Sequence, residues 1–317
     1  MTGRPQRPCG VERHRPTLAL LSASVLWGTA GTASALAATG ANPEAIGAAR
    51  LAVGSLALLG VCAACHRRRH LVALWRWVSR RWVLAAGVAT ALYQAAFFQA
   101  VSSTGVAVGT LIVLGSAPTA CGLLARWWSA EALPGGWVAA TSCAIVGCAL
   151  LVLPDAHGTI RPIGVALAAV AGACYGVYTV SAKRLLSAGH DPLAVLATTL
   201  AAGAVLLAPL LIGGLRPLLD LRGIVLVAWL GIVATALAYL LFARGLGTVA
   251  AAAAGTLGLA EPLTAAALGV VVLGERPGLI AGAGATLLLT GLIIAALAAP
   301  ATTAAPLRSA ARQTSAA

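Results

Sequence analysis

Residues 247–276 read GTVAAAAAGTLGLAEPLTAAALGVVVLGER, and this stretch decides the class of fold. Its first 27 residues contain one charged side chain, Glu261, and the next charges, Glu275 and Arg276, come only after the apolar run. A helix needs about 20 mostly apolar residues to cross a bilayer. Uniformly apolar runs, without alternation, are not typical of membrane-spanning strands. The stretch therefore predicts a transmembrane helix that carries one acid in its interior.

Nine further stretches of the same kind occupy most of the remaining chain. The composition agrees, because 60% of the 317 residues are hydrophobic and 9% are charged, where soluble proteins carry about 25% charged residues. Only Arg50 and Glu261 are charged residues inside these stretches. The sequence thus predicts an all-α integral membrane protein with ten transmembrane helices. The ten stretches are residues 17–39, 45–65, 82–101, 105–125, 133–153, 162–182, 192–215, 223–243, 247–273 and 279–299.

The helix around Glu261 has a counterpart earlier in the chain. Pro262 lies 144 residues after Pro118, and Glu275 lies 144 residues after Glu131. The same offset aligns Phe98 with Phe242 and Gly87 with Gly231. Matches of Phe, Pro and Glu at one offset predict an internal repeat. The expected units are a basic N-terminal tail (1–16), two five-helix repeats (17–153 and 162–299) and a C-terminal tail (300–317).

The repeat and the basic residues together predict the topology. Five spans per unit place the two copies in opposite orientations, as in the inverted repeats of many transporters. With the N-terminus inside, sixteen Lys and Arg residues lie in inner tails and loops and four in outer loops. This bias predicts a multi-pass protein of the plasma or inner membrane with both termini in the cytoplasm. It also explains the net charge of +13 without a nucleic-acid partner, because no basic face with interleaved aromatic residues is present.

Several short motifs resemble the EamA branch of the drug/metabolite transporter superfamily. They are Leu26-Trp27-Gly28, Ala49-Arg50-Leu51, Pro118 followed by Glu131, and Glu261-Pro262-Leu263-Thr264-Ala265 running to Leu273-Gly274-Glu275-Arg276. The resemblance covers about residues 17–299. It implies ten helices in two inverted halves around a central cavity, and the transport of small organic metabolites, often amino-acid-like and often outward. Arg126-Trp127-Trp128-Ser129-Ala130-Glu131 departs from the family's Leu-Gly-Glu ending in the first copy.

Glu261 is the foremost candidate site residue. A carboxylate in hydrocarbon is costly, so it usually faces a cavity or a partner. It could bind a substrate amine, carry a coupling proton, or serve as a structural carboxyl group. Pro262 has no N–H and crowds the Gly258 carbonyl, so we expect a helix break that frees this carbonyl for polar cargo. Pro118 is expected to mark a second helix break, and both prolines should border one central cavity.

Arg50 and three aromatic residues complete the candidate site. Arg50 could bind a substrate carboxylate, but it could equally reach the interface or pair with Glu44. Trp27, Tyr93 and Tyr239 are aromatic candidates for the cavity wall, with helix packing as the alternative. The further polar candidates within spans are Gln94, Gln99, Tyr175 and Tyr178.

Glu131 and Glu275 each precede a proline near the start of the next helix. Pro134 and Pro277 occupy those positions. An acid at this place meets the positive end of the helix dipole, so both glutamates are expected to cap the helix that follows them.

Enzymatic motifs are absent from the sequence, which contains neither a Walker lysine, nor H-E-x-x-H, nor G-x-S-x-G. We therefore expect no catalytic residues, cofactor or metal site, and the lone C-x-x-C of Cys62 and Cys65 is too weak to suggest one. The leading function is secondary active transport, with a substrate, the lipid bilayer and a coupling proton as candidate partners and a homodimer as a candidate assembly. The alternatives are an intramembrane enzyme acting on lipid-linked substrates and a channel-like structural protein.

Overall fold

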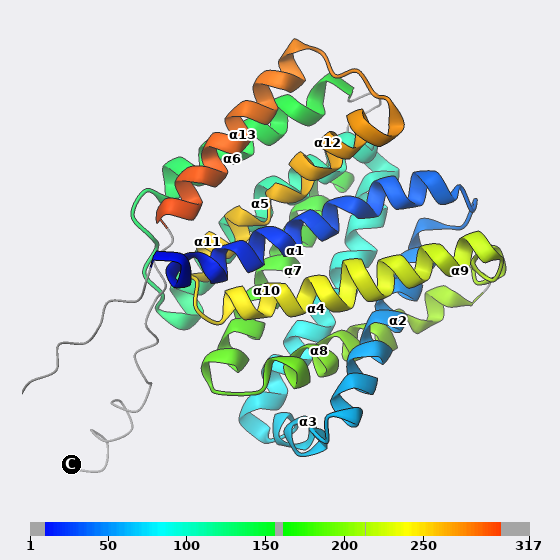
Figure 1. Cartoon of the computed structure of the whole chain (residues 1–317), viewed down its shortest axis with the longest axis vertical. Helices are drawn as coiled ribbons and strands as arrows, with labels where there is room; N and C mark the ends of the chain where they lie inside the picture. The colour runs from blue at the N-terminus through cyan, green and yellow to red at the C-terminus, as the bar shows by residue number, and fades with distance from the viewer. Residues whose placement is uncertain (1–9, 156–160, 213, 299–317) are drawn as a thin grey trace, which may run out of the picture.

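The computed structural model describes residues 10–155, 161–212 and 214–298, and nearly all of them are helical (Figure 1). Within these ranges nine helices are long and apolar enough to cross a membrane, and Trp137–Val152 is a shorter apolar helix. They correspond to the ten predicted stretches, so the all-helical membrane fold is confirmed.

The first five spans are formed by α1 (Gly10–Ala37), α2 (Pro43–Ala64), α4 (Trp77–Thr104), α5 (Val106–Ser129) and α6 (Trp137–Val152), with α3 (Arg68–Leu74) and η1 (Leu153–Asp155) as short additions. The second five are formed by α7 (Pro162–Ser187), α8 (Pro192–Leu207) with η2 (Ala208–Leu211), the continuous run of α9 (Leu221–Ala228), η4 (Trp229–Leu237) and α10 (Ala238–Leu246), then α11 (Ala251–Leu257) with α12 (Ala260–Leu273), and α13 (Leu279–Ala298). The segment η3 (Arg216–Leu218) precedes α9.

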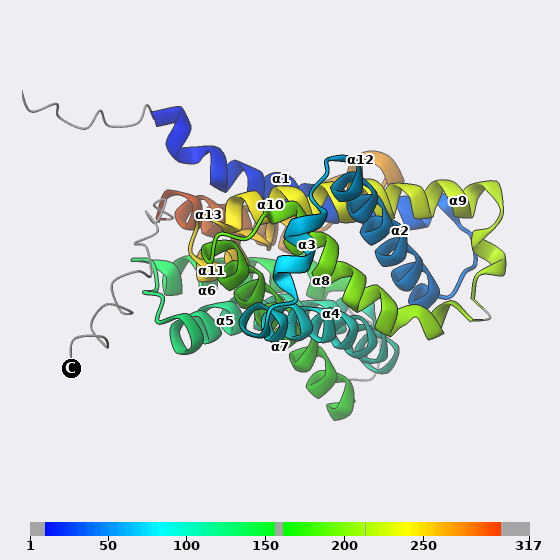
Figure 2. The ribbon, with the colours of Figure 1, turned by 90° about the horizontal axis from the view of Figure 1, so that it is seen from below.

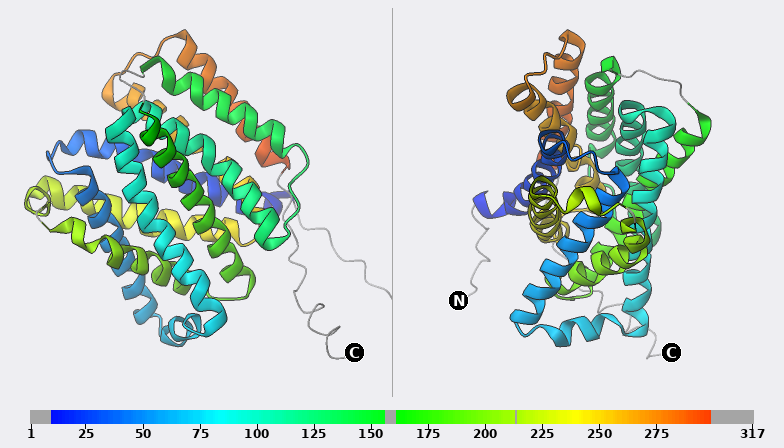
Figure 3. Two further views of the ribbon diagram at one scale, coloured as in Figure 1. Left: turned by 180° about the vertical axis from the view of Figure 1, so that it is seen from behind. Right: turned by 90° about the vertical axis from the view of Figure 1, so that its right-hand side faces the viewer.

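The two halves pack against each other through matching helices. The first span of each half crosses to the other half, because α1 packs against α10 and α12 while α7 packs against α4 and α5. The fifth spans, α6 and α13, lie side by side (Figure 3), and the second spans, α2 and α8, are also paired. Figure 2 shows α1 and α10 on one side of the molecule and α4, α5 and α7 on the other. Both halves contribute helices to each of these two groups.

The buried core lies where the halves meet, and the outer faces remain apolar. The largest buried cluster includes Leu20 of α1, Leu200 of α8 and Phe242 of α10. On the outer faces, Val271 is 81% exposed and Leu279 is 96% exposed. Apolar residues on the outside of a helical bundle are the pattern expected where lipid is the surrounding solvent.

Several predicted spans differ from one uninterrupted α-helix. The stretch 133–153 begins as a helix only at Trp137, after a turn in which Gly136 has φ 76°. The stretch 247–273 is divided into α11 and α12 by a turn at Gly258 and Leu259. By contrast, α5 continues as one α-helix through Pro118, so the second expected helix break is absent. A single proline removes one N–H, and a bend in the helix can accommodate this loss. The turn before Pro262 also contains Gly258, so a glycine and a proline together interrupt the ninth span.

The capping roles expected for the two glutamates were wrong. Glu131 accepts a hydrogen bond from the N–H of Ala251, the first residue of α11, and not from α6. The Glu275 carboxylate lies over Gly269 of α12, and no described N–H of α13 donates to it. In the turns before α6 and α13, the backbone N–H of each glutamate donates to the carbonyl of the residue six positions earlier. This bond directs the glutamate back towards the preceding helix.

Candidate functional site

The break in the ninth span directly precedes Glu261. Because Pro262 has no N–H, the Gly258 carbonyl cannot accept the usual helical bond from it. It accepts instead from the N–H of Glu261 at 3.0 Å, which corrects the expectation that this carbonyl is left free for cargo. The break places Glu261 in the first turn of α12, where the helix dipole favours a negative charge.

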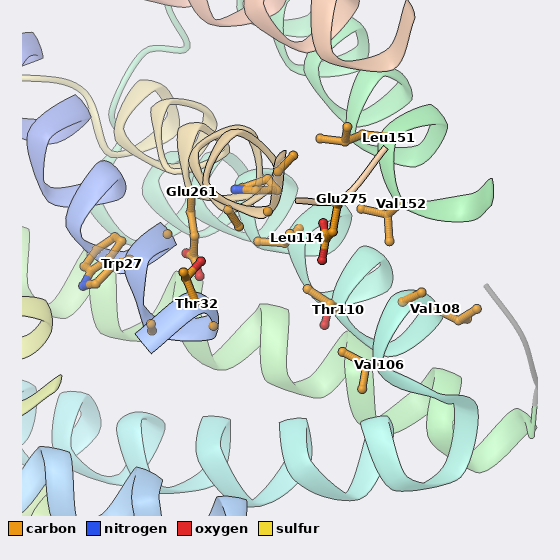
Figure 4. Close-up of a pocket in the computed structure, with 18 of the residues that line it drawn as sticks. Trp27, Thr32, Val106, Val108, Thr110, Leu114, Leu151, Val152, Glu261 and Glu275 are labelled. Atoms are coloured by element: carbon orange, nitrogen blue, oxygen red, sulfur yellow. The ribbon is translucent and has the colours of Figure 1, made fainter. Parts of the chain in front are cut away.

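Glu261 lines three cavities of the described structure. They are a large cavity of about 680 Å³, a smaller one of about 80 Å³ and a third of about 30 Å³. Figure 4 shows its side chain pointing into the large cavity near Trp27 and Thr32. No other described residue lines all three cavities, so Glu261 is the residue that they have in common.

A close approach of α1 to α12 brings Trp27 to the same place. A Cβ atom added to Gly28 would lie 2.7 Å from the Glu261 carbonyl oxygen and 2.7 Å from Cβ of Thr264. Only glycine therefore permits this contact. As a result Trp27, the preceding residue, lines the large and the smaller cavity together with Glu261.

The smaller cavity has an aromatic wall contributed by four helices. The Trp27 and Tyr239 rings meet edge to face with centroids 5.3 Å apart, and Tyr239 meets Tyr178 in the same manner at 5.5 Å. Such pairs stabilise one another beyond their burial alone, which fixes the wall in place. The aromatic residues lining this cavity are Trp27, Tyr93, Tyr175, Tyr178 and Tyr239.

Arg50 brings a positive charge to the smaller cavity. It lines this cavity together with Glu261. Arg67 forms an ion pair with Asp191 and Lys183 forms one with Glu131, and Arg50 belongs to neither pair. Its expected pairing with Glu44 is therefore absent from the described structure. Opposite charges that line one cavity without forming an ion pair are available to a ligand.

Tyr175 adds a buried hydroxyl group with no hydrogen-bond partner among the described residues. A Cβ atom added to Gly258 would lie 3.2 Å from this hydroxyl oxygen, so the group points at the break in the ninth span. Buried polar groups are nearly always hydrogen-bonded in folded proteins. An unpartnered hydroxyl group on a cavity wall is therefore a natural contact for a polar ligand.

The large cavity extends from Glu261 to Glu275. Between these acids it is lined mainly by small and apolar residues of α1, α5 and α12, and the first turn of α5 lies along it. Figure 4 shows Glu275, Thr110 and Val108 around this part of the cavity. Among the described residues, its lining contains two acidic side chains and no basic ones. The large cavity therefore has an acidic lining and shares Trp27 and Glu261 with the smaller, aromatic cavity.

The two prolines line different cavities. Pro262 lines the large cavity, and Pro118 lines the third cavity together with Gly255 and Gly258. Glu261 lines both of these cavities. Pro118 thus borders the central region although α5 is not broken there.

Two further tyrosines belong to the site, and the two glutamines do not. Tyr175 and Tyr178 line the smaller cavity, and their spacing of three residues on α7 was the available signal, since it places both on one helix face. Gln94 is buried and packs near Gly47 of α2 outside the three cavities, and Gln99 is exposed. Trp27, Arg50, Tyr93, Tyr239 and Glu261 all line the smaller cavity.

Comparison with known proteins gives one family and one fold. The profile of the EamA-like transporter family matches this chain twice, at residues 15–153 and 162–297. An uncharacterized transporter of Bacillus subtilis (strain 168), YwfM, is 40% identical over 280 residues, which cover 88% of this chain and 92% of that protein. A protein of known crystal structure has the same fold, with a TM-score of 0.74, 23% identity, and coverage of 90% of this chain and 97% of the other.

Proposed function

Since the chain belongs to the EamA-like transporter family, we propose that it is a secondary active transporter that exports small zwitterionic, amino-acid-like metabolites by alternating access. Family membership makes it a multi-pass membrane transporter with a small-molecule substrate and not an enzyme. The zwitterionic class, the outward direction and proton coupling are the parts that we propose.

The observation that supports a zwitterionic substrate is that Glu261 and Arg50, which have opposite charges, line the same aromatic cavity. A substrate ammonium group would bind Glu261, and its carboxylate group would bind the Arg50 guanidinium bidentately. The Tyr175 hydroxyl would bond to a remaining polar atom, and the aromatic rings would cover the apolar body. Each buried charge is costly without a partner, and a zwitterion supplies both partners at once.

Alternating access is supported by the two matching halves and by the large cavity that Glu261 lines. The cavity reaches Glu261 from the end of the molecule that carries Glu275. Exchange of conformations between two similar, inverted halves would open the other end instead. The outward direction follows what the family resemblance implies. With both termini in the cytoplasm, the Glu275 end would face outward.

The role of Glu261 is tested by Glu261→Gln in proteoliposomes with and without a pH gradient, using a labelled mixture of neutral amino acids. Glutamine keeps the size but cannot carry the charge or the coupling proton. If Glu261 carries the proton, the variant loses gradient-driven accumulation but retains exchange; if it binds the amine, both are lost. Wild-type accumulation would show that the carboxyl group is structural. Glu44→Gln, which changes an acid outside the cavities, is the matched control.

The substrate class is tested by competition with three forms of one compound: an amino acid, its amine without the carboxyl group, and its acid without the amino group. The wild-type protein should prefer the zwitterion. Arg50→Gln should weaken competition by the amino acid and leave competition by the amine nearly unchanged. Arg244→Gln, which changes an exposed arginine of α10, is the control. Equal competition by all three forms in the wild-type protein would refute a zwitterionic substrate.

The orientation is tested with alkaline phosphatase fusions. A fusion after Ala317 should be inactive because the C-terminus is cytoplasmic, and one after Ala41 should be active. High activity at Ala317 would overturn this topology.

A further inference from the structure

The end of the molecule opposite the large cavity is closed by a group of polar contacts around Glu131. One carboxylate oxygen of Glu131 lies 2.9 Å from Nζ of Lys183 on α7. The other oxygen accepts from the N–H of Ala251 at 3.2 Å, and Lys183 also donates to the Val249 carbonyl oxygen. The Glu131 and Lys183 side chains are only 15% and 14% exposed. These contacts join one half of the molecule to the other.

Two more contacts hold α6 against α11 at the same end. The indole N–H of Trp137 donates to the Ala252 carbonyl at 3.1 Å. One helical turn further along each helix, the hydroxyl oxygens of Thr141 and Thr256 are 2.7 Å apart. The ninth span is therefore fixed on both sides, by α6 and by the Glu131 turn.

The cavity end repeats the Glu131 turn but not its contacts. Ala130 and Gly274 both have left-handed backbones, with φ 50° and 74°. The N–H groups of Glu131 and Glu275 both donate at 3.1 Å, to the carbonyls of Ala125 and Gly269 respectively. A Cβ atom added to Gly269 would lie 2.1 Å from Oε2 of Glu275. The Glu275 carboxylate thus folds back over its own helix, and no described residue forms an ion pair with it.

The repeat identifies what Glu275 would contact if this end closed. Moving back 144 residues, the offset that aligns Glu275 with Glu131, takes Ala251 to Ala107. Ala107 lies in the first turn of α5, on the wall of the large cavity with Glu275. The residue before this helix, Gly105, provides no side-chain cap. The N–H groups of this first turn therefore lie across the cavity from the carboxylate that matches Glu131.

We propose that Glu131 with Lys183, and Glu275, are alternating gate residues of the transport cycle. In the present state Glu131 closes its end by binding Lys183 and Ala251, and Glu275 is released. In the opposite state Glu275 binds the first turn of α5, and Glu131 releases α11. This inference rests on the alternating access of the proposed function, but it does not depend on the class of substrate.

The test measures the accessibility of single cysteines in a variant whose seven natural cysteines are replaced. Thr110→Cys reports on the large cavity, and Val249→Cys reports on the closed end, where Val249 is buried. Purified protein in detergent is labelled with a charged maleimide in the absence of substrate. We expect Glu131→Gln and Lys183→Met to speed labelling at Val249→Cys by about fivefold or more and to slow labelling at Thr110→Cys.

The reciprocal change separates a gate from a merely destabilised protein. Loosening of the fold would raise labelling at both cysteines, and that result would overturn the proposal, as would unchanged labelling at both. Glu44→Gln is the control for an acid outside the gates, and Lys183→Arg should preserve the wild-type pattern. Because no substrate is added, an error in the proposed substrate class would leave these results unaffected, whereas absence of alternating access would abolish their reciprocity.

Discussion

The turn at Ala130–Glu131 and the turn at Gly274–Glu275 have the same backbone hydrogen bond, yet their carboxylates lie in different surroundings. The first carboxylate is held by Lys183 and by α11, whereas the second lies over Gly269 beside a cavity. The difference therefore originates in the surroundings and not in the local turn. Two copies of one unit can hold opposite states of the same gate.

The two ends also differ in the residues available for closure. Trp137 corresponds to Ala281 by the offset of 144, so the cavity end has no matching indole group. The first spans of the two halves, α1 and α7, align with a different offset. Gly28 packs on Thr264 of α12, and Gly176 packs on Ala120 of α5. Because Thr264 corresponds to Ala120 by the offset of 144, Gly176 corresponds to Gly28, and the offset for these spans is 148.

By the offset of 148, Lys183 corresponds to Ala35. The cavity end has a carboxylate at the position of Glu131 but no lysine to pair with it. The end that carries Glu131 should consequently be the more stable of the two when closed, which favours the state seen in the structure.

The largest expected difference between the ends comes from Trp137. Its side chain is 9% exposed and lies against Gly122, where an added Cβ would be 2.5 Å from the indole ring. Removing a buried Trp side chain costs about 3–5 kcal/mol, so Trp137→Ala should sharply lower the thermal stability in detergent. Trp127→Ala, which removes an indole that is 74% exposed, should change it little. Equal losses would show that Trp137 does not hold the closed end.

The second prediction compares the two carboxylates. Lys183→Met leaves the largely buried Glu131 carboxylate without its cation, which should cost about 1–3 kcal/mol. Glu131→Gln in the same protein should recover part of this loss, because the unpaired charge is then removed. Glu275→Gln should change the free energy of unfolding by less than about 0.5 kcal/mol. A larger loss for Glu275→Gln than for Lys183→Met would reverse the proposed ranking of the two ends.

Much of this architecture could be predicted from the sequence, for identifiable physical reasons. Uninterrupted apolar runs determine spans, and the repeated Pro and Glu residues revealed the two copies. The missing N–H of proline predicted the helix break before Glu261, but the same reasoning was wrong at Pro118, where α5 is continuous. The partner of Glu131 was not predictable, because Ala251 lies 120 residues further along the chain and only the packing of the halves brings it near.

The candidate site was predictable to a similar degree. Intramembrane charge identified Arg50 and Glu261, because such residues seldom face lipid. Their position on one cavity wall depends on how α2 and α12 pack, which sequence spacing does not specify. The contact of Tyr178 with Tyr239 was not predictable for the same reason, since it joins two helices that are distant in sequence.

The third prediction installs the missing lysine. Ala35→Lys puts a cation at the position that corresponds to Lys183, and an ion pair with Glu275 should favour the state closed at the cavity end by up to about 1 kcal/mol. Labelling at Thr110→Cys should slow by up to about fivefold. Ala35→Met has similar length without the charge and should have little effect, and Glu275→Gln should cancel the effect of the lysine. Slow labelling that persists with Glu275→Gln would mean that the lysine merely blocks the cavity.

The smallest expected effect comes from Gly269→Ala, which makes this position identical to Ala125 of the first copy. The three atoms nearest to the added methyl group belong to the Glu275 carboxyl group, a flexible side-chain end that can rotate away. Alanine is favoured over glycine within a helix by about 1 kcal/mol, so the protein should remain at least as stable as the wild type. The displaced carboxylate must leave Gly269, and the cavity towards α5 is the open space beside it. Labelling at Thr110→Cys should therefore slow by less than about threefold, in keeping with a bias of a few tenths of a kcal/mol. The effect should vanish when Gly269→Ala is combined with Glu275→Gln. If the double variant labels as slowly as Gly269→Ala alone, the methyl group acts through helix packing, and the position of the Glu275 carboxylate does not control this end.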